Sequence, residues 1–199
     1  MLLKMFKCFI YFVFCKLIYR VEFINVNKEK QLQGRNVVCA NHNDWMDAVV
    51  MWTKTEKVRI MAKAELFKVP IWSHLIRAVG AFPIKRGAKD FKSIYHAVKE
   101  VEDGNNLVIF PEGTRKAKLK NVKAKVGAVH IAISAGADII PVYIEPTSKR
   151  PFSKIRVIHG EPYSLSQYRD EIKDKELLNK LTEELMDKIY SLGESLNDK

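Results

Sequence analysis

The sequence predicts an α/β fold: a single layered domain in which a mostly parallel mixed sheet is flanked by helices. Three observations lead to this prediction. Short continuous apolar runs, typical of strands buried on both faces, alternate along the chain with helical patterns. Turn residues such as glycine and proline separate the runs. The length of 199 residues suits one domain with one good core.

The first element, at residues 1–20, is predicted to be a helix that associates with a membrane interface. Residues 8–15 are all apolar or aromatic, and cations flank them on both sides: Lys4, Lys7, Lys16 and Arg20. This uncharged run is far shorter than the ~20 residues that span a bilayer, and no small-residue cleavage site follows it. We expect a short helix that enters one leaflet while its lysines reach lipid phosphates. The alternative is a helix packed on the domain.

Residues 21–199 form the domain itself. Strands are predicted at residues 21–26, 37–40, 58–62 and 81–84, because each of these runs is apolar or alternating. Residues 28–35 read as a polar turn around Gly34. One helix follows the loop after residue 40 and continues to about residue 54. Another covers residues 65–79, with a break at Pro70 and a left-handed cap at Gly80.

The second half of the domain continues the alternation. Asp90 can cap a helix over residues 91–102, and Gly104 lies in the turn that closes it. Strands are predicted at residues 107–110, 139–144 and 155–158, and residues 127–134 form a buried helix that ends at Gly136. Residues 166–199 are predicted to be one C-terminal helix, because apolar residues recur there at helical spacing: Leu177, Leu178, Leu181, Leu185, Ile189 and Leu192.

Charge is the unusual feature of the composition. The chain has 34 Lys and Arg against 23 Asp and Glu, for a formal net charge of +11. This balance favours an anionic partner, such as nucleic acid, an anionic membrane, a phosphorylated substrate or an acidic protein. The three cysteines, without a CxxC spacing, argue against a disulfide framework or a zinc site and favour a reducing, cytosolic compartment. Cys39 is expected in the core.

Polar segments follow three of the predicted strands, at the positions where α/β sheets carry their functional sites. The first holds His42 and Asp47. A histidine can accept a proton at cell pH, and a carboxylate in the first helical turn can hold its other ring nitrogen. No GxSxG motif is present and no cysteine lies beside the pair, so the expected nucleophile is a substrate hydroxyl that His42 deprotonates. Alternatively, Asp47 only stabilises the helix N-terminus and His42 is a surface residue.

The other two segments carry arginines. In residues 110–115, Gly113 lets a backbone amide approach a ligand, and Arg115 offers a fork to a phosphate group. Glu112 could accept a hydrogen bond from a substrate hydroxyl or hold Arg115. Arg86, after the strand at residues 81–84, could form the second half of a phosphate clamp. The alternative for residues 110–115 is an ordinary turn, and the alternative for the segment with Arg86 is a solvated loop.

These segments read NHNDWMD (41–47), GAFPIKRG (80–87), FPEGTR (110–115) and IIPV (139–142). In this order they resemble the four motifs of the glycerophospholipid acyltransferase family, and bacterial 1-acyl-sn-glycerol-3-phosphate acyltransferases most of all. The resemblance covers roughly residues 20–160. It implies transfer of an acyl chain from a thioester to the sn-2 hydroxyl of lysophosphatidate, which forms phosphatidate.

The resemblance also implies roles for particular residues. His42 is the general base and Asp47 its orienter, while Arg86, Glu112 and Arg115 bind the glycerol phosphate. Gly113 supplies a backbone amide to the same loop, and Thr114 belongs to the same motif and is counted among the substrate-binding residues. The family uses no metal, no other cofactor and no covalent enzyme intermediate; the acyl donor is a thioester of acyl-carrier protein or coenzyme A.

The second motif, at residues 80–87, departs from the family pattern at Pro83 and Lys85, and Arg86 keeps its place in the pattern. The fourth motif continues from Pro141 and Val142 into Tyr143 and Ile144, which either shape the acyl site or fill the sheet, and we favour the sheet.

Two basic features extend the predicted site. A hydroxyl that attacks a thioester builds an oxyanion, which needs a positioned donor. Lys63 ends the strand after the His42 helix, so it is expected to stabilise this oxyanion together with backbone amides. The alternative is a solvated lysine.

Residues 115–125 hold six cations and no acid. They are expected to bind lipid headgroups, the acidic carrier protein or coenzyme A, or else to form a solvated loop.

The expected partners are therefore an anionic membrane surface, lysophosphatidate and an acyl thioester. The expected location is the cytoplasmic face of the cell membrane, with peripheral or monotopic attachment. Nucleic acid is not expected, because no RNA-binding aromatic motif, zinc spacing or glycine-rich KH loop is present. Two alternatives stay open: an acyltransferase of this fold that acts on another lysolipid, and a non-catalytic basic protein that binds lipid or nucleic acid.

Overall fold

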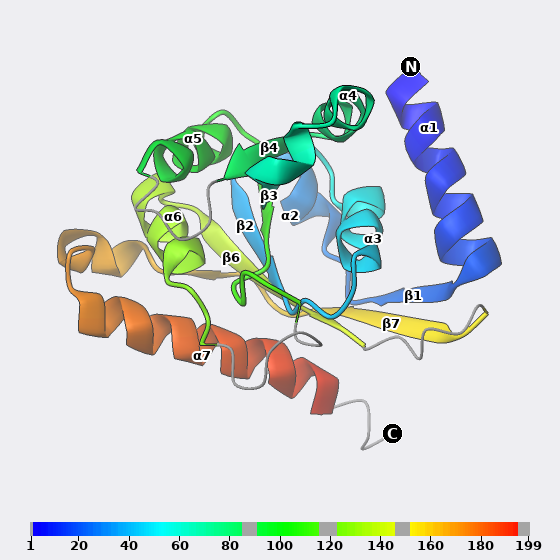
Figure 1. The fold of residues 1–199 in the computed structure, drawn as a ribbon. Helices are drawn as coiled ribbons and strands as arrows, with labels where there is room; N and C mark the ends of the chain where they lie inside the picture. Colours follow the sequence, from blue (N-terminus) through cyan, green and yellow to red (C-terminus); the bar gives the residue numbers. More distant parts are fainter. Residues whose placement is uncertain (1, 85–90, 116–122, 146–151, 195–199) are drawn as a thin grey trace.

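The computed structural model describes residues 2–84, 91–115, 123–145 and 152–194. A central sheet runs through the molecule and helices cover it (Figure 1). Within the described residues the sheet has eight strands in the order β1-β7-β6-β2-β5-β3-β4, with β8 paired to β6. Every pairing of neighbours is parallel except those of β7 and β8 with β6. The predicted mostly parallel mixed sheet is therefore confirmed.

The strands are β1 (Arg20–Ile24), β2 (Asn36–Ala40), β3 (Val58–Lys63), β4 (Ala81–Ile84), β5 (Asn106–Ile109), β6 (Asp138–Ile144), β7 (Lys154–His159) and β8 (Tyr163–Ser164). The α-helices are α1 (Leu2–Ile10), α2 (Lys28–Gln33), α3 (Met46–Lys54), α4 (Pro70–Ala78), α5 (Phe91–Glu102), α6 (Gly127–Ala135) and α7 (Lys175–Glu194). The π-helix η1 (Tyr11–Ile18) continues α1, and η2 (Ala64–Phe67) and η4 (Ser166–Glu171) are short 3-10 helices.

The core lies on both faces of the sheet. In β2, Val37 and Cys39 face the cluster that α5, α6 and α7 cover, whereas Val38 and Ala40 face the cluster under α3 and η1. Every residue of β2 is buried, as expected for a central parallel strand with helices on both sides. The carboxyl end of β2 is thereby fixed in the middle of the sheet, where the loop that carries His42 begins.

Two predicted segments differ from the structure. Residues 28–35 contain the short helix α2 rather than a turn, because the Asn27 side chain caps it by accepting a hydrogen bond from the Lys30 N–H at 2.9 Å. Gly34 ends this helix with φ of +75°, and a Cβ there would lie 2.0 Å from the carbonyl oxygen of Gly104.

The C-terminal region is not one helix either. Residues 166–171 form η4, and α7 begins only at Lys175. The Asp174 side chain accepts hydrogen bonds from the backbone N–H groups of Glu176 and Leu177, at 2.8 and 3.1 Å, and so caps a new helix. Residues 195–199 lie outside the described residues.

The N-terminal helix packs on α3 along one side. The Lys7 ammonium donates to the carbonyl oxygen of Thr55 at 2.7 Å, and the Phe6 ring lies 6.2 Å from the Trp52 ring. Cys15 is completely buried. Among the described residues, no helix combines the length and the apolar character needed to cross a bilayer.

One buried group makes the stability of the fold depend on pH. His159 ends β7 with 2% of its surface exposed, and neither ring nitrogen has a hydrogen-bond partner among the described residues. Burial lowers the pKa of this imidazole to about 4, because the charged form would lose its hydration. In the unfolded chain the imidazole has a pKa near 6.5. The unfolded state therefore binds the extra proton between these values, and stability falls as the pH falls through them.

We predict that lowering the pH from 7 to 5 removes about 2 kcal/mol from the free energy of unfolding through His159 alone. Urea unfolding at both pH values measures it. In His159→Leu this contribution disappears. An equal pH dependence in His159→Leu and the wild type would contradict the prediction.

Candidate active site

His42 and Asp47 form a hydrogen-bonded pair between β2 and α3. His42 Nδ1 lies 3.0 Å from Asp47 Oδ2, and Asp47 is only 2% exposed. The same carboxylate oxygen accepts hydrogen bonds from the backbone N–H groups of Asn43 and Asp44, at 2.6 and 2.8 Å. Because an ionised carboxylate can only accept, this contact places the ring hydrogen on Nδ1 and leaves Nε2 with a free lone pair.

The loop before this pair is attached to the neighbouring strand β6. The Asn41 side chain donates to the carbonyl oxygen of Ile144 at 2.8 Å and accepts from its N–H at 2.7 Å. The Asn43 side chain donates to the same carbonyl oxygen at 3.2 Å. An amide that satisfies both backbone groups of one residue imitates a strand pairing, so the first and fourth motifs are held together.

A second carboxylate supports His42 from the third motif. Glu112 Oε2 accepts a hydrogen bond from the His42 backbone N–H at 3.1 Å, and Glu112 Oε1 accepts one from the Tyr190 hydroxyl. The Glu112 residue is 4% exposed. The imidazole of His42 also stacks on the Phe110 ring, with centroids 4.2 Å apart and planes at 23°. The backbone and the ring of His42 are thus both held by the FPEGTR segment.

Tyr190 brings the C-terminal helix into this arrangement. It lies on α7, and its ring meets that of Tyr143 at 6.3 Å in an edge-on contact. The pKa of the Tyr190 hydroxyl is raised well above its ordinary value by burial and by its hydrogen bond to Glu112. Tyr190 therefore stays a neutral donor at any physiological pH.

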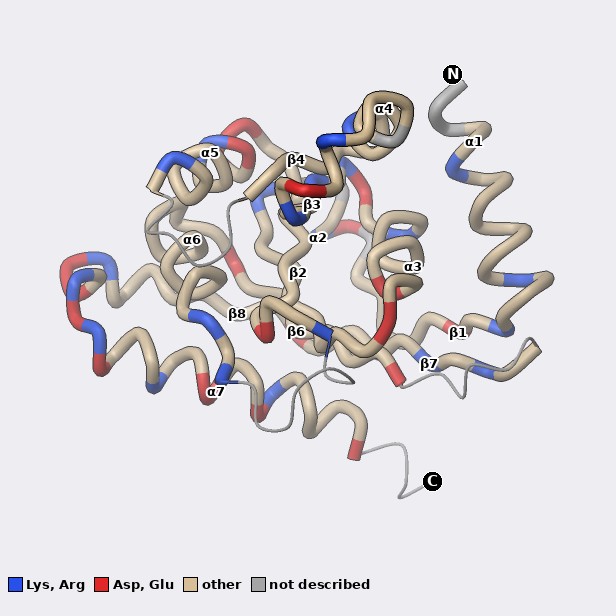
Figure 2. Tube along the Cα trace, in the orientation of Figure 1, with Lys and Arg blue, Asp and Glu red and all other residues tan. Residues whose placement is uncertain are grey.

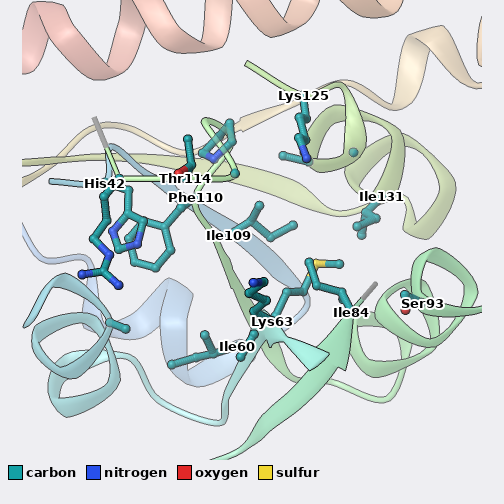
Figure 3. Close-up of a pocket in the computed structure, with 18 of the residues that line it drawn as sticks. His42, Ile60, Lys63, Ile84, Ser93, Ile109, Phe110, Thr114, Lys125 and Ile131 are labelled. Atoms are coloured by element: carbon teal, nitrogen blue, oxygen red, sulfur yellow. The ribbon is translucent and has the colours of Figure 1, made fainter. Parts of the chain in front are cut away.

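A cleft of about 560 Å³ opens beside His42 (Figure 3). Its polar lining includes His42, Lys63, Thr114, Arg115 and Lys125. Its walls are mostly aliphatic, with Ile60, Met61, Leu66, Ile84, Ile94, Ile109 and Ile131. A cleft that combines an imidazole, several cations and a long apolar wall suits an amphiphilic, anionic ligand.

Glycine at position 113 allows Lys125 to reach the third motif. Gly113 has φ of +66°, and a Cβ there would lie 2.9 Å from Lys125 Cε. The Lys125 backbone N–H donates to the carbonyl oxygen of Pro111 at 2.8 Å. The Lys125 stem is thus laid across the loop that carries Thr114 and Arg115, and all three residues line the cleft.

The structure brings together most of the residues that the sequence singled out. His42, Lys63, Gly113, Thr114 and Arg115 all line the cleft. Lys63 lies at the end of β3, and its ammonium is 3.4 Å from a Glu65 carboxylate oxygen. Asp47 and Glu112 do not line the cleft. Asp47 is hydrogen-bonded to the His42 ring, and Glu112 accepts from the His42 backbone N–H.

Three expectations concern residues that the structure does not describe. Arg86 and Asp90 lie outside the described residues, as do positions 116–122 of the basic run. Sequence reasoning missed Lys125 as a distinct cleft residue, and it missed the contacts made by Phe110 and Tyr190. Gly113 was the available signal for Lys125, because a glycine in a loop often marks a close approach by another group.

Comparisons with known proteins place these residues in a family. The model of a family described as Acyltransferase matches residues 21–145. The chain is 30% identical over 167 residues to the 1-acyl-sn-glycerol-3-phosphate acyltransferase of Bacillus subtilis (strain 168), a match that covers 81% of this chain and 82% of the relative. It is 33% identical over 152 residues to the enzyme of the same name from Streptococcus pneumoniae (strain ATCC BAA-255 / R6), covering 73% and 56%.

A solved structure is similar as well. The crystal structure of the 1-acyl-sn-glycerophosphate (LPA) acyltransferase PlsC from Thermotoga maritima matches with a TM-score of 0.62 and 25% identity. The match covers 92% of this chain and 79% of that chain, so it includes nearly all of the fold described above.

The contact between Tyr190 and Glu112 gives a testable prediction. Tyr190→Phe leaves a buried carboxylate oxygen without its hydroxyl donor, which should lower the free energy of unfolding by roughly 1–3 kcal/mol. Tyr143→Phe is the matched control, because it removes a hydroxyl from the neighbouring ring without touching Glu112. Urea unfolding measures both. Equal stabilities of the two variants would contradict the role assigned to Tyr190.

Proposed function

This chain belongs to the acyltransferase family, and we propose that it transfers an acyl chain from an acyl thioester to the sn-2 hydroxyl of lysophosphatidate, forming phosphatidate. The observation that carries the proposal is the His42–Asp47 pair at the mouth of a cleft with both cations and an apolar wall. Lysophosphatidate has the matching parts: a hydroxyl, a phosphate monoester and an acyl chain. The names of the similar bacterial enzymes support the same acceptor.

In the proposed reaction, Nε2 of His42 takes the proton from the sn-2 hydroxyl. The hydroxyl oxygen attacks the carbonyl carbon of the thioester, and a tetrahedral oxyanion forms. The carbon–sulfur bond then breaks, the carbonyl is restored as an ester, and the proton passes from His42 to the departing sulfur. No enzyme nucleophile takes part in this sequence. Cys39, the cysteine nearest to His42 in the sequence, is completely buried, and burial strongly raises the pKa of its thiol.

The proposal assigns a role to each side chain. Asp47 fixes the His42 tautomer, and Glu112 holds the His42 backbone while its other oxygen is bound to Tyr190. Arg115 binds the acceptor phosphate, and Arg86 remains the expected second arginine. Gly113 and Thr114 contribute polar groups of the same loop.

Lys63 is proposed to stabilise the oxyanion. The donor is acyl-carrier protein or coenzyme A, and no metal or further cofactor is invoked. We place the reaction at the cytoplasmic face of the membrane, with peripheral or monotopic attachment.

Lys125 is added here to the proposed phosphate site. Its stem lies over Gly113, between the loop and the cleft, and no acidic partner of its ammonium is found among the described residues. An ammonium that lines a cleft beside an arginine and has no carboxylate partner is well suited to a phosphate oxygen.

The activity is tested with purified protein and three acceptors, lysophosphatidate, lysophosphatidylcholine and glycerol 3-phosphate, each with an acyl-carrier-protein and a coenzyme A donor. The expected product is phosphatidate from lysophosphatidate, with little acylation of the other two acceptors. His42→Ala should lower kcat by about 10³-fold or more, because the proton acceptor is lost. His74→Ala, at an exposed histidine, should keep wild-type kcat. Acylation of another acceptor alone, or full activity of His42→Ala, would contradict the proposal.

The role of Lys125 is tested separately with Lys125→Met. The KM for lysophosphatidate should rise roughly 10–100-fold, because a charge-assisted hydrogen bond to phosphate is lost. Lys123→Met removes the same charge from an exposed position that does not line the cleft, so its KM should stay within about twofold of wild type. With 1-acylglycerol, which lacks the phosphate, Lys125→Met and the wild type should behave alike. A rise confined to the KM of the acyl donor would assign Lys125 to the donor instead.

A further inference from the structure

The helix α4 presents exposed apolar side chains at the edge of the sheet. It lies beside β4, where the sheet ends, and follows directly on η2 (Figure 1). Ile71 is 86% exposed, Val69 57% and Leu75 40%. Ile71 and Leu75 are one helical turn apart and so lie on the same face. A surface helix normally turns its large aliphatic residues inward, so this exposed face indicates a contact beyond those made within the described part of the chain.

This apolar face continues to the cleft. Leu66 in η2 both lines the cleft and is 46% exposed. Trp45 lines the cleft as well and is 54% exposed, and its ring meets the ring of Phe14 in η1 at 6.5 Å. We call Trp45, Leu66, Val69, Ile71 and Leu75 the rim surface. It connects the cleft mouth to the N-terminal helix, whose own exposed apolar residues are Met5, Phe6, Phe9, Phe12 and Leu17.

The charges around this surface favour an anionic occupant. Residues 63–84 contain three cations, Lys63, Lys68 and Arg77, but only one acid, Glu65. The first acid of the chain is Glu22, so α1 and η1 carry lysines but no carboxylate (Figure 2). The Arg77 guanidinium lies 4.9 Å from the Phe67 ring centroid. An apolar face bordered by cations is the composition that binds the interface of an anionic bilayer.

We propose that the rim surface is a second bilayer contact, separate from the N-terminal helix, and that it turns the mouth of the cleft toward the lipid. Its link to catalysis rests on the proposed function, because an acceptor with an acyl chain could then enter the cleft without crossing water. Two contacts on different elements also fix the orientation of the protein on the membrane, which one short helix alone leaves free to rotate.

The contact is tested with the double variant Ile71→Ser/Leu75→Ser and the apolar control Ile71→Leu/Leu75→Ile. The probe is a vesicle of phosphatidylcholine and phosphatidylglycerol. Removing two exposed aliphatic side chains should weaken vesicle binding at least about tenfold, whereas the control should bind like the wild type. Transfer to lysophosphatidate in the same vesicles should fall with binding. Transfer to lysophosphatidate dispersed in detergent should stay within about twofold of wild type.

These arms separate the two proposals. Absence of transfer in detergent by the wild type would refute the proposed function but leave the binding comparison intact. Equal vesicle binding by the serine variant and the wild type would overturn the rim surface whatever the activity.

The position of α4 relative to the bilayer is measured with a nitroxide label at Ile71→Cys. The background carries Cys8→Ser, since Cys8 is the exposed cysteine. The matched label is at Asp187→Cys, an exposed position on α7. With vesicles, the label at 71 should become inaccessible to a water-soluble relaxation agent, while the label at 187 stays accessible. Protection of position 71 without lipid, together with a dimer in sedimentation, would instead assign the rim surface to a second copy of the chain and overturn the proposal.

Discussion

The candidate site depends on one carboxylate oxygen. Asp47 Oδ2 receives two backbone N–H groups of the loop and the Nδ1 of His42, so a single buried atom fixes both the loop and the imidazole. The loop cannot rotate away without leaving a buried charge unpaired, which is costly in a protein interior. The orientation of Nε2 toward the cleft is therefore a consequence of the way the chain passes from β2 into α3.

The surrounding elements extend this constraint across the sheet. Asn41 ties the loop to β6, and Glu112 ties the His42 backbone to the end of β5 and, through Tyr190, to α7. The C-terminal helix is thus part of the scaffold of the site, although it contributes no residue to the cleft lining. Buried networks whose members are all satisfied are rigid, and rigidity is what a general base needs to meet a substrate hydroxyl at hydrogen-bond distance.

Much of this arrangement could be predicted from the sequence because it is local. The apolar run before His42 indicated a buried strand, and the carboxylate at position 47 fell in the first turn of the next helix. The direction of a side chain at a strand end is not local. Glu112 was expected to bind substrate or Arg115, yet its carboxylate accepts from the His42 N–H and the Tyr190 hydroxyl, because β5 lies beside β2 and α7 packs across β6. The break before α7 was missed because the leucine spacing begins only at Leu177 and does not report on residues 166–174, where Asp174 caps the start of a separate helix.

In the proposed mechanism, Asp47 makes His42 a base by holding hydrogen on Nδ1. The most direct measurement is kcat for Asp47→Asn against Asp44→Asn in the acyl-transfer assay. In Asp47→Asn, one amide atom must take the place of Oδ2. An amide oxygen there would keep the three contacts without the negative charge that stabilises the imidazolium, and an amide nitrogen would donate to Nδ1 and put the hydrogen on Nε2. We predict a loss of about 10³-fold or more for Asp47→Asn with the fold intact, and a nearly wild-type kcat for Asp44→Asn. A loss below about tenfold in a folded Asp47→Asn protein would contradict it.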